Sequence, residues 1–212
     1  MEKISINPVV LYQGCIVAAI AHAVAVGEFP ELNYEHSWDG CNYCMNDSQG
    51  RRATITFHSQ YIIAVFQDVS KFSRAKNVYD YLSGMPDDIL KVAESEALQY
   101  VLEDMDGEVR PVITAAFWGN WNELFSNQPL NEILENGGYI VKNQLLDYHD
   151  GLKKWDEHYG FDNNQKNLIL SLFQRKMKNK EMDIRLSEEE IKCLYGDIEE
   201  CRESLQELNI HL

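Results

Sequence analysis

An apolar, alanine-rich segment is the first feature in the pattern of hydrophobic positions. Residues 11–26, LYQGCIVAAIAHAVAV, are apolar on nearly every face of a helix, which is typical of a helix enclosed by other elements. Its most apolar part, residues 15–26, is too short to span a bilayer. Phe29-Pro30-Glu31 follows where a signal peptide would carry small residues. We therefore predict a buried N-terminal helix.

The hydrophobic period then changes to that of β-strands. Residues 53–57 alternate between apolar and polar, and residues 61–66 form a β-branched and aromatic run. Asn46 to Gly50 supplies the turn chemistry of a hairpin before the first of these strands. Residues 109–118 predict another strand, which Pro111 limits to an edge or to pairing that begins after it. This part of the chain predicts a mainly antiparallel sheet.

Helical spacing returns between the strands and dominates the C-terminal third. It predicts helices over 74–82, 86–104 and 129–136, and a strand at 139–141. Beyond residue 147 the pattern is helical, with Asp162-Asn163-Asn164 and Ser187-x-x-Glu190 as helix starts. Residues 209–212 could form a terminal strand.

The order of these elements indicates the class of fold. It predicts an α+β fold with a small, mainly antiparallel sheet, a buried N-terminal helix and a helical C-terminal third. We expect an α+β domain at 1–146 with a helical extension at 147–212 packed on it. One single domain over 1–212 is the alternative, since the length allows both.

Charge limits the classes of partner. The 212 residues include 34 acidic and 19 basic side chains, a net charge of -15, which opposes binding to nucleic acid or to an anionic membrane. Acidic residues concentrate at the end, where residues 181–212 hold Glu181, Asp183, Glu188, Glu189, Glu190, Asp197, Glu199, Glu200, Glu203 and Glu207. This segment is either a solvated helical face or a docking surface for a basic protein partner.

The cysteines bear on the cellular compartment and on a possible metal or redox motif. Five cysteines are an odd number spread over a mid-sized chain, which favours a reduced, cytoplasmic protein over a disulfide framework. Cys41-x-x-Cys44, with His36 and His58, has ligand types that suit zinc. A second ligand pair at typical spacing is missing, and residues three apart on a strand point to opposite faces. We therefore predict no metal, no redox centre and no cofactor.

Cys15 suggests a catalytic alternative. It follows Gln13-Gly14 where the apolar helix is expected to open, and a helix N-terminus stabilises a thiolate. Papain-like thiol hydrolases place a cysteine at a helix start, then a histidine on a later strand, then an orienting residue. The corresponding roles here would be Cys15 as nucleophile, His58 as base, Asp68 as orienting residue and Gln13 as oxyanion donor.

Amphipathic aromatic residues near glycines predict a recognition groove. The expected binding residues lie around two short segments, Ser37 to Gly40 and Phe117 to Asn120, and are His36, Trp38, Asp39, Asn42, Tyr43 and Trp118. The alternative for these aromatic rings is ordinary packing. His22 lies two turns after Cys15 on the same helical face and is interpreted as a core histidine bonded to a carbonyl.

Three short motifs, L-Y-Q-G-C at 11–15, H-S-W-D-G-x-N-Y at 36–43 and T-I-T-F-H-S at 54–59, resemble an uncharacterised group of bacterial proteins. This resemblance implies a bacterial, cytosolic origin and says nothing about activity. Together, the charge and the aromatic segments favour a cytoplasmic protein-binding module of the immunity or antitoxin type. A thiol hydrolase or transferase is the alternative, and the oligomeric state stays open.

Overall fold

The computed structural model describes residues 1–179 and 183–212. The chain folds into two compact units, and each unit is made of two separate segments of the sequence. The first unit consists of residues 1–9 and 41–142, and the second consists of residues 10–40 and 143–212. A single boundary after residue 146 does not express this interleaving.

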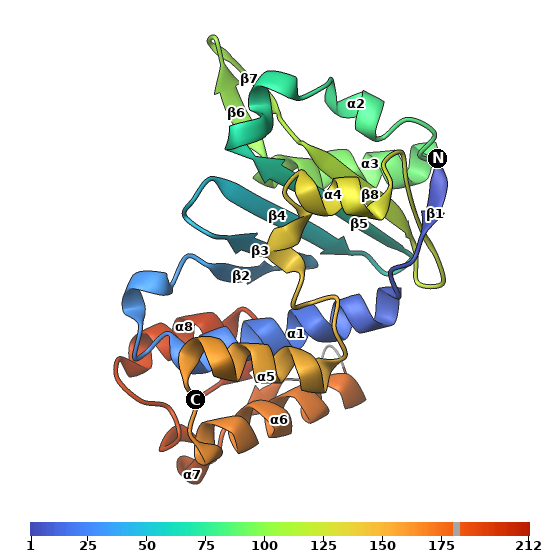
Figure 1. The fold of residues 1–212 in the computed structure, drawn as a ribbon. Helices are drawn as coiled ribbons and strands as arrows, with labels where there is room; N and C mark the ends of the chain where they lie inside the picture. Colours follow the sequence, from blue (N-terminus) through green and yellow to red (C-terminus); the bar gives the residue numbers. More distant parts are fainter. Residues whose placement is uncertain (180–182) are drawn as a thin grey trace. The chain divides into compact units, whose positions relative to one another are not determined.

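A sheet forms the centre of the first unit (Figure 1). Its strands pair antiparallel in the order β1-β9-β8-β5-β4-β3. In chain order they are β1 (Glu2–Ile4), β3 (Asn42–Asn46), β4 (Arg51–Phe57), β5 (Tyr61–Asp68), β8 (Ala115–Asn120) and β9 (Leu124–Ser126). The predicted turn at 46–50 joins β3 to β4, and the Asp47 carboxylate accepts hydrogen bonds from the backbone N–H groups of Gln49 and Arg51.

Short helices follow the strands of this unit and cover its core. They are η2 (Val69–Arg74), α2 (Val78–Tyr81), α3 (Asp87–Ser95), η3 (Ala97–Tyr100), α4 (Leu130–Glu135) and η4 (Gly138–Val141). Apolar side chains of α2, α3 and η3 pack with Ile63 and Val65 of β5 and with Trp118 of β8. The hydrophobic faces of the predicted helices therefore meet one face of the sheet.

Two predicted elements of the first unit are wrong, and the strand predicted over 109–118 is divided between Glu108–Pro111 and Ala115–Asn120, which belong to different sheets. The helix predicted over 86–104 ends at Ser95, and residues 102–105 form β6, which pairs with β7 (Glu108–Pro111) in a separate hairpin. The strand predicted at 139–141 is the 3-10 helix η4, which Gly137 starts with φ of +113°. Local apolar periodicity cannot reveal either change, because a short apolar run fits both kinds of element.

Helices dominate the second unit, together with three short strands. Its elements are α1 (Pro8–Ala25, of which the first two residues belong to the first unit), η1 (Pro30–Leu32), β2 (His36–Asp39), α5 (Tyr148–Tyr159), α6 (Asn163–Lys178), β10 (Ile184–Arg185), α7 (Glu188–Ile191), α8 (Ile198–Gln206) and β11 (Ile210–His211). The predicted helix start at Asp162 and the predicted capping box at Ser187 are confirmed, and Asp162 also forms a capping box, with Gln165. The terminal strand β11 pairs parallel with β10.

Helix α1 is buried, as predicted. It is long and apolar enough to cross a membrane by length and composition, but 83% of it is buried inside the protein. A Cβ on Gly14 would lie 2.1 Å from the Gln144 carbonyl oxygen, so only glycine permits this close approach of two chain segments. The α+β class, the mainly antiparallel sheet and the helical C-terminal part are confirmed.

Candidate functional site

Cys15 does not have the environment of a catalytic thiol. Helix α1 begins at Pro8, so Cys15 lies two turns inside it rather than at its N-terminus. Its side chain is fully buried, and burial raises the pKa of the thiol well above its ordinary value. The expected dipole effect is therefore absent, since it falls off within the first turn. Gln13, the expected oxyanion donor, is half-buried on the same helix.

The structure does not bring His58 and Asp68 together. Phe57 pairs with Ile62 at one end of the β4–β5 ladder, and Arg51 pairs with Asp68 at the other end. His58 follows Phe57 directly, so about 20 Å of strand separates it from Asp68. Asp68 instead contacts the Arg51 guanidinium at 3.6 Å and accepts two hydrogen bonds from Ser70. It orients Arg51 and Ser70 rather than a histidine.

Most of the predicted recognition residues are interior. His36, Trp38, Asn42, Tyr43 and Trp118 are each at most 9% exposed, so they offer little surface to a partner. The Trp38 indole donates to the Gly40 carbonyl, and the Trp38 backbone N–H donates to the Glu207 carboxylate at 2.7 Å. Of the predicted binding set, Asp39 is exposed. The packing alternative describes the aromatic members better.

Asn42 has a structural partner set inside the first unit. Its amide nitrogen donates to the Glu96 carboxylate at 2.8 Å, and its amide oxygen accepts from the Thr56 hydroxyl at 2.6 Å. These bonds tie β3 to β4 and to the residue between α3 and η3. A buried amide with donors and acceptors matched in this way stabilises a fold.

The cysteine pair shows no converging ligand set. All five cysteines are free thiols. Cys41 precedes β3, and the Cys44 sulfur lies 3.7 Å from the Thr54 hydroxyl on the neighbouring strand. Neither thiol belongs to the group of potential metal ligands that converges within residues 1–179 and 183–212.

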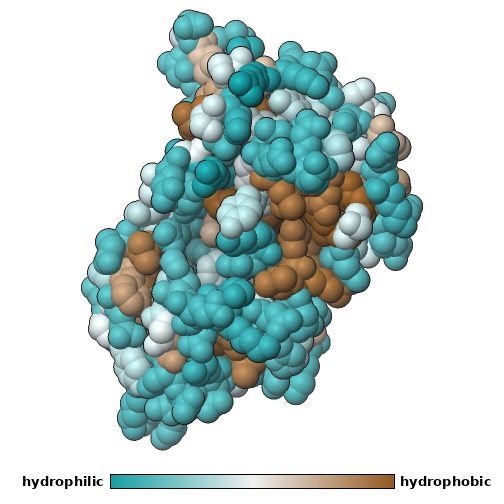
Figure 2. Space-filling model, viewed as in Figure 1, coloured by the Kyte–Doolittle hydropathy of each residue, from teal (hydrophilic) through white to brown (hydrophobic). Residues whose placement is uncertain are grey.

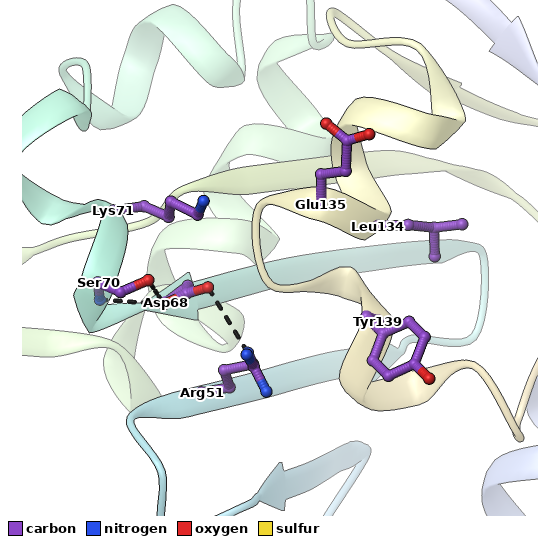
Figure 3. A pocket seen from close by; sticks show the side chains of 7 residues that line it. All are labelled: Arg51, Asp68, Ser70, Lys71, Leu134, Glu135 and Tyr139. Atoms are coloured by element: carbon purple, nitrogen blue, oxygen red, sulfur yellow. Dashed lines mark hydrogen bonds and ion pairs between the residues drawn. The ribbon is translucent and has the colours of Figure 1, made fainter.

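A cavity of about 320 Å³ opens on the first unit (Figure 3). Arg51, Asp68 and Ser70 form a linked group on one side, while Leu134, Glu135 and Tyr139 come from the α4–η4 segment. A neighbouring cavity of about 290 Å³ shares Lys71 and Glu135 and adds Arg74 and Lys76. Within the described part of the chain, no carboxylate lies within 4 Å of the Lys71, Arg74 or Lys76 side-chain nitrogens. The Glu132 and Glu135 carboxylates line the same cavity as these three cations, so its lining is of mixed charge.

A second group of functional side chains lies in the second unit. His22 belongs to the last turn of α1, and the chain turns back through η1 so that Glu35 and His36 lie beside it at the start of β2. One ligand atom from each of these three residues lies within 4.8 Å of the other two. The two imidazole rings are 4.9 Å apart between centroids. We call this group the histidine cluster.

Helix α5 closes around the histidine cluster with aromatic side chains. The Trp155 indole packs edge-on against the His36 ring at 5.1 Å. The Tyr159 hydroxyl lies 3.3 Å from His22 Nδ1. His22 Nε2 is buried and has no hydrogen-bond partner among the described residues. The cluster therefore contains a nitrogen lone pair or N–H that the fold itself does not use.

Burial controls the charge of both imidazoles. It lowers the pKa of His22 to about 4, the Asn33 carbonyl opposes this change, and the nearby His158 adds to it. Burial, and then the charges of His22 and His158, lower the pKa of His36 well below its ordinary value. Burial and next the Glu35 carboxylate raise the pKa of Tyr159. Both imidazoles are therefore neutral at pH 7, which is the form that binds metal ions.

From the sequence, His22 is predicted to be a core histidine and His36 part of a recognition segment. A metal set of His22 with His36 and His149-Asp150, as in metal phosphohydrolases, is disfavoured there because those folds are almost wholly helical. Comparisons of the chain with protein families, with curated proteins and with solved structures found no match.

Proposed function

We propose that this protein is a binding module of the immunity or antitoxin type, which recognises a basic protein partner through acidic side chains of its second unit. The observation that carries this proposal is the exposure of the acidic segment near the C-terminus. Its exposed members are Asp183, Glu188, Glu189, Asp197, Glu199, Glu203 and Glu207, while Glu181 lies outside the described residues. A negatively charged surface accelerates association with a positively charged partner and disfavours partners of the same charge.

The character of the surface supports electrostatic rather than apolar recognition by the second unit. Among the described residues, the second unit exposes one large hydrophobic side chain, Tyr34. The first unit exposes seven, including Val69, Leu102 and Val109. Figure 2 shows hydrophobic residues gathered beside α4 of the first unit. The thiol hydrolase alternative has weaker support, because Cys15 is buried and its pKa is raised.

Matched charge variants test this proposal. Glu189→Gln/Glu203→Gln removes two charges from the acidic segment, and Glu2→Gln/Glu108→Gln removes two exposed charges from the first unit. A basic partner recovered from the native host at low salt should associate more slowly with the first variant, and with a weaker salt dependence, than with the second. Recovery of no basic protein, or equal effects of the two variants, would contradict the proposal.

A further inference from the structure

We propose that His22, Glu35 and His36 bind a divalent transition-metal ion of the zinc class. The proposal is independent of the partner proposed above, because it concerns the interior of the second unit. Two imidazoles and one carboxylate form a ligand set that zinc proteins use when a fourth position stays open to water or substrate. Magnesium and calcium prefer sets made of oxygen alone.

The geometry is close to that of a metal centre. Tetrahedral zinc with bonds of about 2 Å holds its ligands roughly 3.3 Å apart, and the three ligand atoms here all lie within 4.8 Å of one another. Small side-chain rotations close this difference. Glu35 is half-buried, next to His36 in sequence and outside the helices.

The strongest independent support for metal binding is the difference in hydrogen bonding between the two ring nitrogens of His22. Nδ1 lies beside the Tyr159 hydroxyl, the Asn33 carbonyl acts on the ring electrostatically, and the buried Nε2 makes no hydrogen bond of normal geometry among the described residues. Metal-bound histidines commonly hold one nitrogen by such an outer contact, which fixes the tautomer and leaves the other nitrogen for the metal. A buried polar atom without a hydrogen bond is costly, and a metal bond to Nε2 removes that cost.

Neighbouring groups define the rest of the site. Trp155 packs on His36 and excludes water from one side. His158 is exposed, and its charge acts on both cluster imidazoles. His158 also packs on the Trp155 and Tyr159 rings, so α5 aromatic side chains and a neighbouring imidazole enclose the two histidines of the site.

The test uses untagged, EDTA-treated protein of full length with Cys41→Ser/Cys44→Ser, so that the C-x-x-C thiols cannot bind the probe. Calorimetric titration with Zn²⁺ should show one ion per chain, and the melting temperature should rise with Zn²⁺ concentration. Mg²⁺ should produce neither effect. Absence of stoichiometric Zn²⁺ binding in this protein would overturn the proposal.

Variants assign the ligands. His22→Ala and Glu35→Ala should each abolish stoichiometric binding or weaken it at least a hundredfold, while His149→Ala, an exposed histidine of α5, should leave it unchanged. Tyr159→Phe should weaken binding about tenfold, since it removes only the outer contact. Circular dichroism checks folding, and the half-buried Glu35 provides a ligand test if His22→Ala does not fold. Unchanged affinity in folded Glu35→Ala and His22→Ala would place the ion elsewhere and refute the assignment.

Discussion

In the first unit, buried Asn42 donates to Glu96 and accepts from Thr56, so both ends of its amide are used. In the second unit, His22 is as deeply buried, but its Nε2 meets no acceptor or donor among the described residues. The Asn42 bonds connect strands and have an evident structural role. Buried polar atoms without a hydrogen bond occur in the first unit too, at Gln67 Oε1 and Gln128 Oε1. The His22 atom differs because it lies in a group of potential metal ligands with Glu35 and His36.

The largest expected effect tests whether the interior of the second unit is closed. Iodoacetamide should modify Cys15 at least about a thousandfold more slowly than half-buried Cys41 and Cys193, because labelling of Cys15 requires opening of the structure. Mass spectrometry of peptides after timed labelling measures both rates in one sample. Rapid labelling of Cys15 in the native protein would mean that water reaches α1, so that His22 on the same helix would not be enclosed as Asn42 is.

The next effect concerns pH in the metal-free protein. The pKa of His22 is about 4 in the folded state and 6.5 ordinarily, so the unfolded chain binds more protons between these values. The contribution of neutral His22 to the free energy of unfolding is fully present above pH 6.5, and it falls by about 3 kcal/mol as the pH decreases to 4. Urea unfolding across this range measures the loss.

A matched variant isolates the His22 contribution from other titrating groups. The ring faces His36 and Glu35 from the β2 side, Tyr159 and His158 from α5, and the Asn33 carbonyl. His22→Gln cannot titrate, so its stability should decline less steeply with falling pH. Parallel curves for the two proteins would show that His22 is already solvated.

A smaller effect tests the satisfied network of the first unit. Asn42→Ala should lower the free energy of unfolding by about 2 kcal/mol, because the Thr56 hydroxyl and the Glu96 carboxylate lose their partner. Asn46→Ala lies on the same strand and removes only an exposed contact with the Ser48 N–H, so it serves as the control. Equal costs for both variants would show that the network adds no stability.

Local signals explain which parts of the fold could be predicted from the sequence. The helix starts at Asp162 and Ser187 are predictable because an N-cap depends on the residue type at the start itself, and at Ser187 also on Glu190 three positions later. The β6–β7 hairpin was missed because the apolar pattern of 86–104 continues past Ser95, and the break at Glu96 carries no glycine or proline. Short-range chemistry therefore identified helix starts better than helix ends.

The histidine cluster depends on information that no short segment contains. His22 and His36 are separated by the turn at Phe29-Pro30, and Trp155 and Tyr159 arrive from a helix more than a hundred residues later. Whether these side chains meet depends on the packing of α1, β2 and α5. The sequence offers the residue types but not their convergence.

The smallest expected effect is the most direct test of the difference between the two units. In EDTA-treated protein, His22→Leu should change the free energy of unfolding by less than about 1 kcal/mol, because the loss of the interactions with Tyr159 and the Asn33 carbonyl is offset by removal of the buried Nε2 that lacks a hydrogen bond. His22→Leu/Tyr159→Phe replaces both partners with apolar groups and should be nearly neutral. Chemical denaturation at pH 7 measures both variants beside Asn42→Ala. A loss above 2 kcal/mol for His22→Leu would mean that His22 supports the fold as Asn42 does.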